Sequence, residues 1–290
     1  MHWQTSRFSI DLGQPKVMGI VNLTPDSFTD GGLYASTGAA LGHCEQLLKD
    51  GAHILDLGAE SSRPGAEPVP AELELARLLP VLTQAVRLGV PISVDTYKPA
   101  VMQAALDLGA DIINDIWALR WAPAQSGPGS LSARQVVAAH PACGVCLMHM
   151  HREPQTMQTA PMVGDAVPQV AAFLSAMADA LLGLGVARER IVLDPGIGFG
   201  KSVAQNFSLL AQQYVLSDSG YPVLAGWSRK SSLAALLPVA TGLAADPGPH
   251  PRMVASVAAA LLAVERGASI VRVHDVAETV QALAVLSAIK

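Results

Sequence analysis

Eight short apolar runs recur along the chain, and most of them end in a polar or charged residue. They occupy residues 17–22, 53–58, 91–95, 111–115, 145–150, 190–194, 222–229 and 269–274. The average repeat of about 36 residues is the length of one strand, one helix and their loops. We therefore predict eight strands that alternate with helices.

Many of the predicted helices close with a glycine that is followed by a small apolar residue. Glycine tolerates the left-handed conformation at a helix C-terminus, so each pair predicts a junction between a helix and the next strand. The pairs are Gly51-Ala52, Gly89-Val90, Gly109-Ala110, Gly185-Val186 and Gly267-Ala268.

Eight such units close naturally into a (β/α)₈ TIM barrel, an α/β fold. The loop-like stretches 122–130 and 245–251 are too short to separate domains, so we expect one domain over residues 1–290, with its core from about 17 to 288. The alternative is a doubly wound open sheet, which carries GxGxxG after its first strand. This chain has NLTPDSF there, which favours the barrel.

The composition excludes several classes of protein. Hydrophobic residues make up 50% of the 290 residues and charged residues 15%, which excludes disorder and predicts a large core. The net charge of -5 argues against a nucleic-acid binder. The longest near-apolar stretch, 254–264, is about half of what a membrane helix needs. No secretory signal is evident at the N-terminus, so we expect no membrane association and a cytoplasmic protein.

Three motifs suggest chemistry that their context does not support. Three cysteines cannot form a disulfide framework, and we interpret the pair Cys143 and Cys146 as small buried residues rather than a redox or zinc site. Strand alternation also places Cys146 and His149 on opposite faces, which disfavours a metal site. The segment 195–202 ends like a phosphate-binding P-loop but lacks the glycine required five residues before Gly200.

Polar residues gather where the predicted strands end, and in a barrel these ends share the face that carries the active site. Acids, amides and cations there suit a planar heterocycle with N–H donors and a separate anion, most commonly phosphate. Acids at strand ends also commonly cap helices or pair with cations, and Asp56 is the strongest candidate for a purely structural role, with Asp115 and Asp275 as possible helix caps. The set comprises Asn22, Asp56, Asp95, Asn114, Asp194, Ser228, Lys230, Arg272 and His274, and the loops add Arg63 and Lys201.

Eight segments resemble, in order, the motifs of the dihydropteroate synthase family of folate biosynthesis. They lie at 18–32, 55–66, 92–99, 112–116, 146–150, 193–201, 226–231 and 270–276, and include MGIVNLTPDSFTDGG, SSRPGA and GWSRKS. The resemblance implies a (β/α)₈ barrel and a homodimer built on the outer helices. It also implies an enzyme that joins 6-hydroxymethyl-7,8-dihydropterin diphosphate to 4-aminobenzoate and releases pyrophosphate.

The resemblance also implies a role for each matching residue. In this family pattern the pterin is bound by Asp95, Asn114, Asp194 and Lys230 in a slot lined by Met148 and Phe199. Arg272 stacks on the pterin and, with His274 and Asn22, holds the diphosphate, and Asn22 also contacts Mg²⁺. The second loop contributes Ser62 and Arg63, and the aminobenzoate entrance is bordered by Phe28 and Pro64, with Ser231 and Lys230 opposite.

These roles are chemically consistent. Magnesium and the cations Arg63, Arg272 and His274 would stabilise the leaving pyrophosphate, while Asp95 faces the positive charge that develops on the pterin. The arylamine is the nucleophile, which fits the absence of an evident Ser-His-Asp or Cys-His arrangement.

The chain departs from the family pattern in small ways, and two rival functions stay open at this point. Ala59 replaces a usual glycine, Ser62 stands where threonine is frequent, Trp227 is bulkier than expected, and 245–251 is an insertion. The rivals are a methyltetrahydrofolate:corrinoid methyltransferase domain, which would not need Lys230, and a catalytically silent barrel paralogue.

Overall fold

The computed structural model of the chain describes residues 1–24, 32–63, 65–122, 130–236 and 249–289. Phe28, Pro64 and most of the two expected surface insertions, 122–130 and 245–251, lie outside the described residues.

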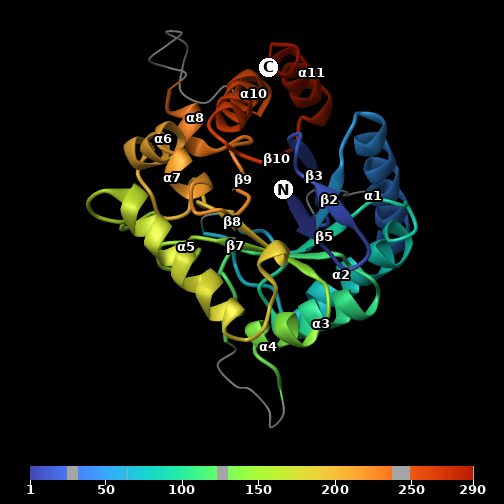
Figure 1. Ribbon diagram of the computed structural model, residues 1–290. Helices are drawn as coiled ribbons and strands as arrows, with labels where there is room; N and C mark the ends of the chain where they lie inside the picture. Colours follow the sequence, from blue (N-terminus) through green and yellow to red (C-terminus); the bar gives the residue numbers. More distant parts are fainter. Residues whose placement is uncertain (25–31, 64, 123–129, 237–248, 290) are drawn as a thin grey trace.

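Eight parallel strands follow the eight apolar runs and form one sheet in the order β8-β7-β6-β5-β4-β3-β10-β9. A parallel bridge between Leu193 and Val223 brings the two ends of this order together, so that the strands surround the centre of the molecule (Figure 1). The (β/α)₈ prediction is confirmed. The strands are β3 (Lys16–Asn22), β4 (Ile54–Gly58), β5 (Ile92–Asp95), β6 (Ile112–Asp115), β7 (Gly144–Met148), β8 (Ile191–Asp194), β9 (Leu224–Ala225) and β10 (Ile270–Val273).

Helices cover the outside of the strands (Figure 1). The five glycines predicted at junctions between helices and strands all have positive φ, from 76° at Gly89 to 100° at Gly51, which confirms those junctions. The helices are α1 (Gly32–Lys49), α2 (Ala71–Ala85), α3 (Pro99–Asp107), α4 (Ala133–Ala139), α5 (Ala166–Leu182), the 3₁₀ turn η2 (Arg188–Arg190), α6 (Val203–Ala211), α7 (Tyr214–Ser217), α8 (Ser231–Ala234), α10 (Pro249–Glu265) and α11 (Val276–Ser287).

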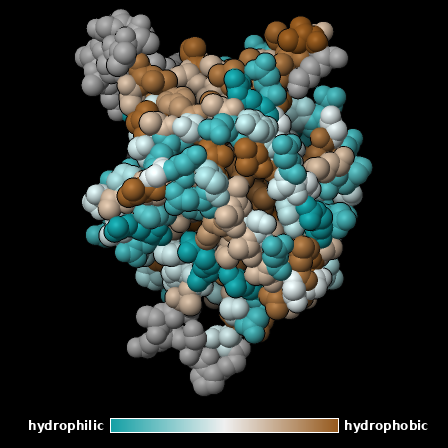
Figure 2. All heavy atoms as spheres, turned by 60° about the vertical axis from the view of Figure 1, so that its left-hand side comes forward, coloured by the Kyte–Doolittle hydropathy of each residue, from teal (hydrophilic) through white to brown (hydrophobic). Residues whose placement is uncertain are grey.

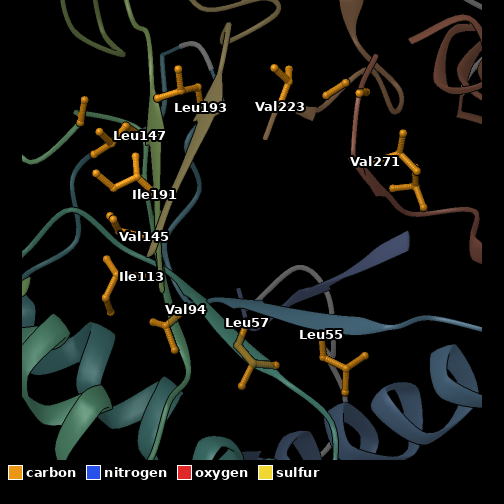
Figure 3. Close-up of a cluster of buried hydrophobic side chains, with 14 of the residues drawn as sticks. Leu55, Leu57, Val94, Ile113, Val145, Leu147, Ile191, Leu193, Val223 and Val271 are labelled. Atoms are coloured by element: carbon orange, nitrogen blue, oxygen red, sulfur yellow. The ribbon is translucent and has the colours of Figure 1, made fainter. Parts of the chain in front are cut away.

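Alternate residues of each strand face opposite sides of the sheet, which divides the core into two parts. Outward-facing residues such as Leu57, Val94 and Leu147 belong to the large cluster that packs beneath the helices (Figure 3). The inward-facing residues at the starts of the strands form a second, smaller cluster that includes Ile54 and Ile112. The strand ends are therefore left to carry the polar side chains.

A hairpin that the sequence analysis did not predict closes the N-terminal end of the barrel. Its strands, β1 (His2–Gln4) and β2 (Ser9–Asp11), pair antiparallel. Trp3 is fully buried in the inner cluster, and its indole N–H donates to the carbonyl oxygen of Arg190 at 3.0 Å. The hairpin thus fills the end of the barrel opposite the polar strand ends.

The cysteines are buried and Cys146 and His149 lie on opposite faces of β7, as the sequence analysis predicts. All three cysteines are free and buried. Cys146 lies in the inner cluster, whereas the His149 ring packs against Phe173 outside the barrel, at 4.9 Å between centroids. Within the described ranges, no three His, Cys, Asp or Glu side chains are grouped so that they could hold a metal ion. None of the helices searched there is long and apolar enough to cross a membrane.

We expect Trp3→Ala to lower the free energy of unfolding by about 3 to 5 kcal/mol, because it removes a large buried side chain and leaves a cavity. Urea unfolding followed by circular dichroism measures the change. His2→Ala, at an exposed neighbouring position, is the control and should unfold at the wild-type midpoint. Equal midpoints for all three proteins would show that the hairpin does not stabilise the barrel.

Candidate active site

The floor of the site is a guanidinium group held between two carboxylates inside the barrel. Arg272 of β10 donates from Nε to Asp56 Oδ2 at 2.6 Å and from Nη2 to Asp95 Oδ2 at 2.8 Å. Asn114 Nδ2 also donates to Asp56 Oδ2, at 3.3 Å. Asp56 is fully buried, so its structural role is to fix Arg272. Four strand-end residues of the sequence analysis are thereby brought together.

Burial and the ion pairs together set the pKa values of Asp95 and Arg272. Burial raises the pKa of Asp95 to about 7, against the opposing effect of Arg272. Burial opposes the charge of Arg272 itself, but Asp56 and Asp95 together raise its pKa. The arginine is therefore a permanent cation, while Asp95 is a carboxylate whose charge is sensitive to pH.

One wall of the site is the glycine-rich segment after β8. Asp194 Oδ1 accepts the Gly196 N–H at 2.7 Å, and burial raises the pKa of Asp194. Gly196 has φ +66°, and a Cβ added there would lie 1.9 Å from the His149 carbonyl oxygen, so only glycine fits. Lys201 donates to three backbone carbonyls, including that of Gly196 at 2.8 Å. Lys201 therefore holds this loop together and does not project into the pocket.

Met148 and Phe199 form an apolar cluster beside Asp194 with Ile116, Met150 and Met157. Lys230 Nζ lies 4.2 Å from the centroid of the Phe199 ring, within the range of a cation–π contact. Burial lowers the pKa of Lys230 to about 8. The expected slot residues and the expected lysine are thus in contact.

The opposite edge joins the loop after β9 to the end of β10. The Ser228 hydroxyl lies 2.9 Å from His274 Nδ1 and accepts the His274 backbone N–H at 3.1 Å. Burial, followed by the charges of Arg229 and Arg272, lowers the pKa of His274 to about 3. His274 is therefore neutral near pH 7, which differs from the cation that the sequence analysis expects.

The two acids expected to cap helices act differently. Asp275 stands at the N-cap of α11 without a side-chain cap bond, and it pairs with Arg229 Nη2 at 2.6 Å instead. Asp115 accepts the backbone N–H groups of Trp117 and Leu119, both at 2.7 Å, and so stabilises a turn rather than a helix. Residue Leu119 of that turn has φ +60°.

The second loop carries Ser62, which is half-buried, and Arg63, which is exposed. Its base is held by Glu60, which accepts the Tyr97 hydroxyl at 2.7 Å and pairs with Lys98. Lys98 is itself buried and pairs with Glu74 of α2 at 2.6 Å. A cavity of about 470 Å³ beside this loop is lined by residues that include Glu60, Ser62, Asp95, Tyr97, Trp117 and Trp121.

The remaining expected residues lie at the edge of the site. Asn22 ends β3 and is half-buried, and Ser231 begins α8 as an exposed residue directly after Lys230. Sequence reasoning missed the supporting contacts of Glu60 and Arg229. Both lie within the quoted motifs, but their partners are distant in the sequence, so only their presence in those motifs could have indicated a role.

Comparison with known proteins places the chain in one enzyme family. Residues 18–274 match the family described as pterin binding enzyme. The dihydropteroate synthase of Neisseria meningitidis serogroup C is 48% identical over 284 residues, which cover 97% of this chain and 95% of that protein.

Solved structures agree with this assignment. The Burkholderia cenocepacia dihydropteroate synthase complexed with 7,8-dihydropteroate has a TM-score of 0.84 and 48% identity, over 99% of this chain and 96% of that one. The Xanthomonas albilineans dihydropteroate synthase with 4-aminobenzoic acid has a TM-score of 0.85 and 44% identity, over 100% of this chain and 98% of that one. The chain therefore belongs to the pterin-binding enzyme family and, within it, to the dihydropteroate synthases.

Proposed function

We propose that this chain joins 6-hydroxymethyl-7,8-dihydropterin diphosphate to 4-aminobenzoate, giving 7,8-dihydropteroate and pyrophosphate, and that residues 1–290 form one domain for this reaction. The observation that carries the proposal is the half-buried Arg272 between Asp56 and Asp95, on the face of the barrel that also presents Asp194 and Lys230. Support comes from relatives of high identity that were solved with dihydropteroate and with 4-aminobenzoic acid.

The pterin fits a slot whose polar groups complement its edge. Asp194 accepts from the amino-pyrimidine N–H groups, and Asn114, Asp95 and Lys230 supply the other hydrogen bonds. Met148 and Phe199 cover the ring, and the Arg272 guanidinium stacks on its face. Asp194 is well placed for this role, because its Oδ1 is already oriented by the Gly196 N–H.

The leaving group requires charge stabilisation. As the CH₂–O bond breaks, negative charge grows on the pyrophosphate and positive charge on the pterin. Arg272 and Arg63 stabilise the first as cations, His274 does so as a hydrogen-bond donor, and Asp95 stabilises the second. The arylamine nitrogen supplies the electron pair for the new C–N bond and then loses a proton. No covalent intermediate with the protein is needed.

The aminobenzoate lies at the mouth of the site, against the turn that carries Lys230. Ser231 and Lys230 form one wall, and Ser62 belongs to the second loop of the site. The two other residues assigned to this entrance, Phe28 and Pro64, lie outside the described residues. The exposed position of Ser231 suits the entry of a second substrate.

A magnesium ion would bind at this site together with the diphosphate of the substrate. Among the described residues, no three Asp, Glu, His or Cys side chains are grouped so that they could bind a metal by themselves. Asn22 offers one amide oxygen at the end of β3. Mg²⁺ prefers to keep several waters and to bind substrate phosphates, so one protein oxygen is enough to place it. When bound, it would neutralise charge on the leaving pyrophosphate.

We place the protein in the cytoplasm. Its outer helices suit a homodimer. Val254, Ala258 and Leu262 lie four residues apart on the exposed face of α10, and Val254 is 70% exposed. Val285 of the adjacent α11 is also exposed. Figure 2 shows hydrophobic residues at the upper end of the molecule, where Figure 1 places α10 and α11.

A pyrophosphate-release assay tests the proposed reaction. With the pterin diphosphate and Mg²⁺ present, we expect release to depend on added 4-aminobenzoate and to collapse in Lys230→Ala, which loses a pterin contact. The mutant's circular dichroism spectrum and melting temperature control for folding. Pterin binding without release in the wild-type protein would instead favour a catalytically silent paralogue.

The pH profile tests the role of Lys230. Since burial lowers its pKa to about 8, the ammonium group is lost as the pH rises through that value, and we expect kcat/KM to fall there. Lys230→Arg keeps its charge at every accessible pH, so its profile should lack this alkaline fall, whatever its absolute rate. A fall of the same shape in both proteins would assign the titration to another group.

Solution mass tests the dimer. A charge placed in an apolar interface is unfavourable, so Val254→Glu should shift the mass measured by light scattering from dimer to monomer. Val163→Glu introduces the same charge at another highly exposed valine, away from α10, and should leave the mass unchanged. A wild-type monomer, or a dimer unaffected by Val254→Glu, would contradict this interface.

A further inference from the structure

The contact between Ser228 and His274 has a feature that the proposed reaction does not explain. The serine hydroxyl oxygen meets two nitrogens of the same residue, the His274 backbone N–H at 3.1 Å and the ring Nδ1 at 2.9 Å. Ser228 is buried, with 7% of its surface exposed. Strands β9 and β10 are hydrogen-bonded neighbours, which fixes the two residues relative to each other.

The direction of the second hydrogen bond follows from counting hydrogens. The backbone N–H of His274 is always a donor, so the serine oxygen accepts there. Nδ1 is the only acceptor that the described residues offer to the serine hydroxyl hydrogen. If Nδ1 carried a proton, the buried hydroxyl hydrogen would be left without an acceptor, which costs about 1 to 3 kcal/mol.

The surroundings of His274 act in the same direction. Four cations, Arg229, Arg272, Arg63 and Lys230, lower the pKa of the ring, after burial as the largest cause. The acid next to it in sequence, Asp275, is already paired with Arg229. The ring nitrogen Nε2 has no hydrogen-bond partner within the part of the chain described here.

We infer that Ser228 is a positioning residue that fixes His274 in the neutral form protonated at Nε2. The hydroxyl donates to Nδ1, and the ring therefore presents one N–H, at Nε2, to an oxygen of the diphosphate. The assignment of a diphosphate oxygen as the partner of Nε2 rests on the proposed function, whereas the protonation state of His274 in the free enzyme does not depend on it. The hydrogen bond at one ring nitrogen thus decides what the other nitrogen does.

Nitrogen NMR of the ring reads this state directly. In ¹⁵N-histidine-labelled protein, with His274 assigned by its loss in His274→Gln, we expect Nδ1 to resonate as an unprotonated nitrogen and Nε2 as a protonated one. Adding pyrophosphate should move the Nε2 resonance and leave Nδ1 unprotonated. Ser228→Ala should yield a mixture of tautomers, since Nδ1 has lost its donor.

Kinetics show what the fixed tautomer contributes. Ser228→Ala should lower kcat by about 10-fold to 100-fold, the usual cost of losing an orienting partner, with a smaller change in KM for the pterin diphosphate. Ser228→Thr keeps the hydroxyl and should recover most of the rate. Ser256→Ala is the matched control, because Ser256 is a buried serine that accepts the Arg229 N–H at 2.9 Å and so supports the same loop without touching His274.

Three outcomes would overturn the inference. They are a proton on Nδ1 in the free wild-type enzyme, an unchanged tautomer in Ser228→Ala, and a loss of kcat in Ser256→Ala as large as that in Ser228→Ala. The NMR result stands apart from turnover. If the wild-type protein released no pyrophosphate, the proposed function would fail while the tautomer could still be read.

Discussion

The structure of the site depends on one half-buried cation that is paired with two acids. Arg272 lies inside the barrel, where an unpaired charge would cost several kcal/mol, and it is paired with Asp56 and Asp95 from two other strands. Strand β3 separates β10 from β4 and β5 in the sheet order, so this contact crosses the interior of the barrel. The two ion pairs hold the arginine in this position, and the rest of the pocket is arranged around it.

The crowding of charge around Arg272 determines what its neighbours can do. Burial, followed by nearby cations, keeps His274 neutral, and burial lowers the pKa of Lys230 to about 8. Burial raises the pKa of Asp95 to about 7 in spite of its ion pair. The site thus combines the permanent charge of Arg272 with groups whose charge is set by their surroundings, which suits a reaction that develops opposite charges at two places.

The loops that carry the reactive groups are supported by ion pairs outside the pterin slot. Glu60 ties the second loop to Lys98, and Asp275 ties the loop after β9 to α11 through Arg229. Both pairs lie within motifs that the sequence analysis quoted for other residues. Motifs of this kind therefore include the residues that hold the loops as well as those that contact substrate.

The sequence by itself determined the eight strands, the helix ends and the face on which polar residues gather, because these follow from local periodicity and from the conformational freedom of residues such as Gly51. It did not reveal the N-terminal hairpin, whose strands have three residues each and whose Trp3 bonds to Arg190, 187 positions away. Nor did it show that Lys201 holds its own loop or that His274 is neutral. Only the tertiary structure decided these points, because pairing and desolvation depend on which distant groups are brought together.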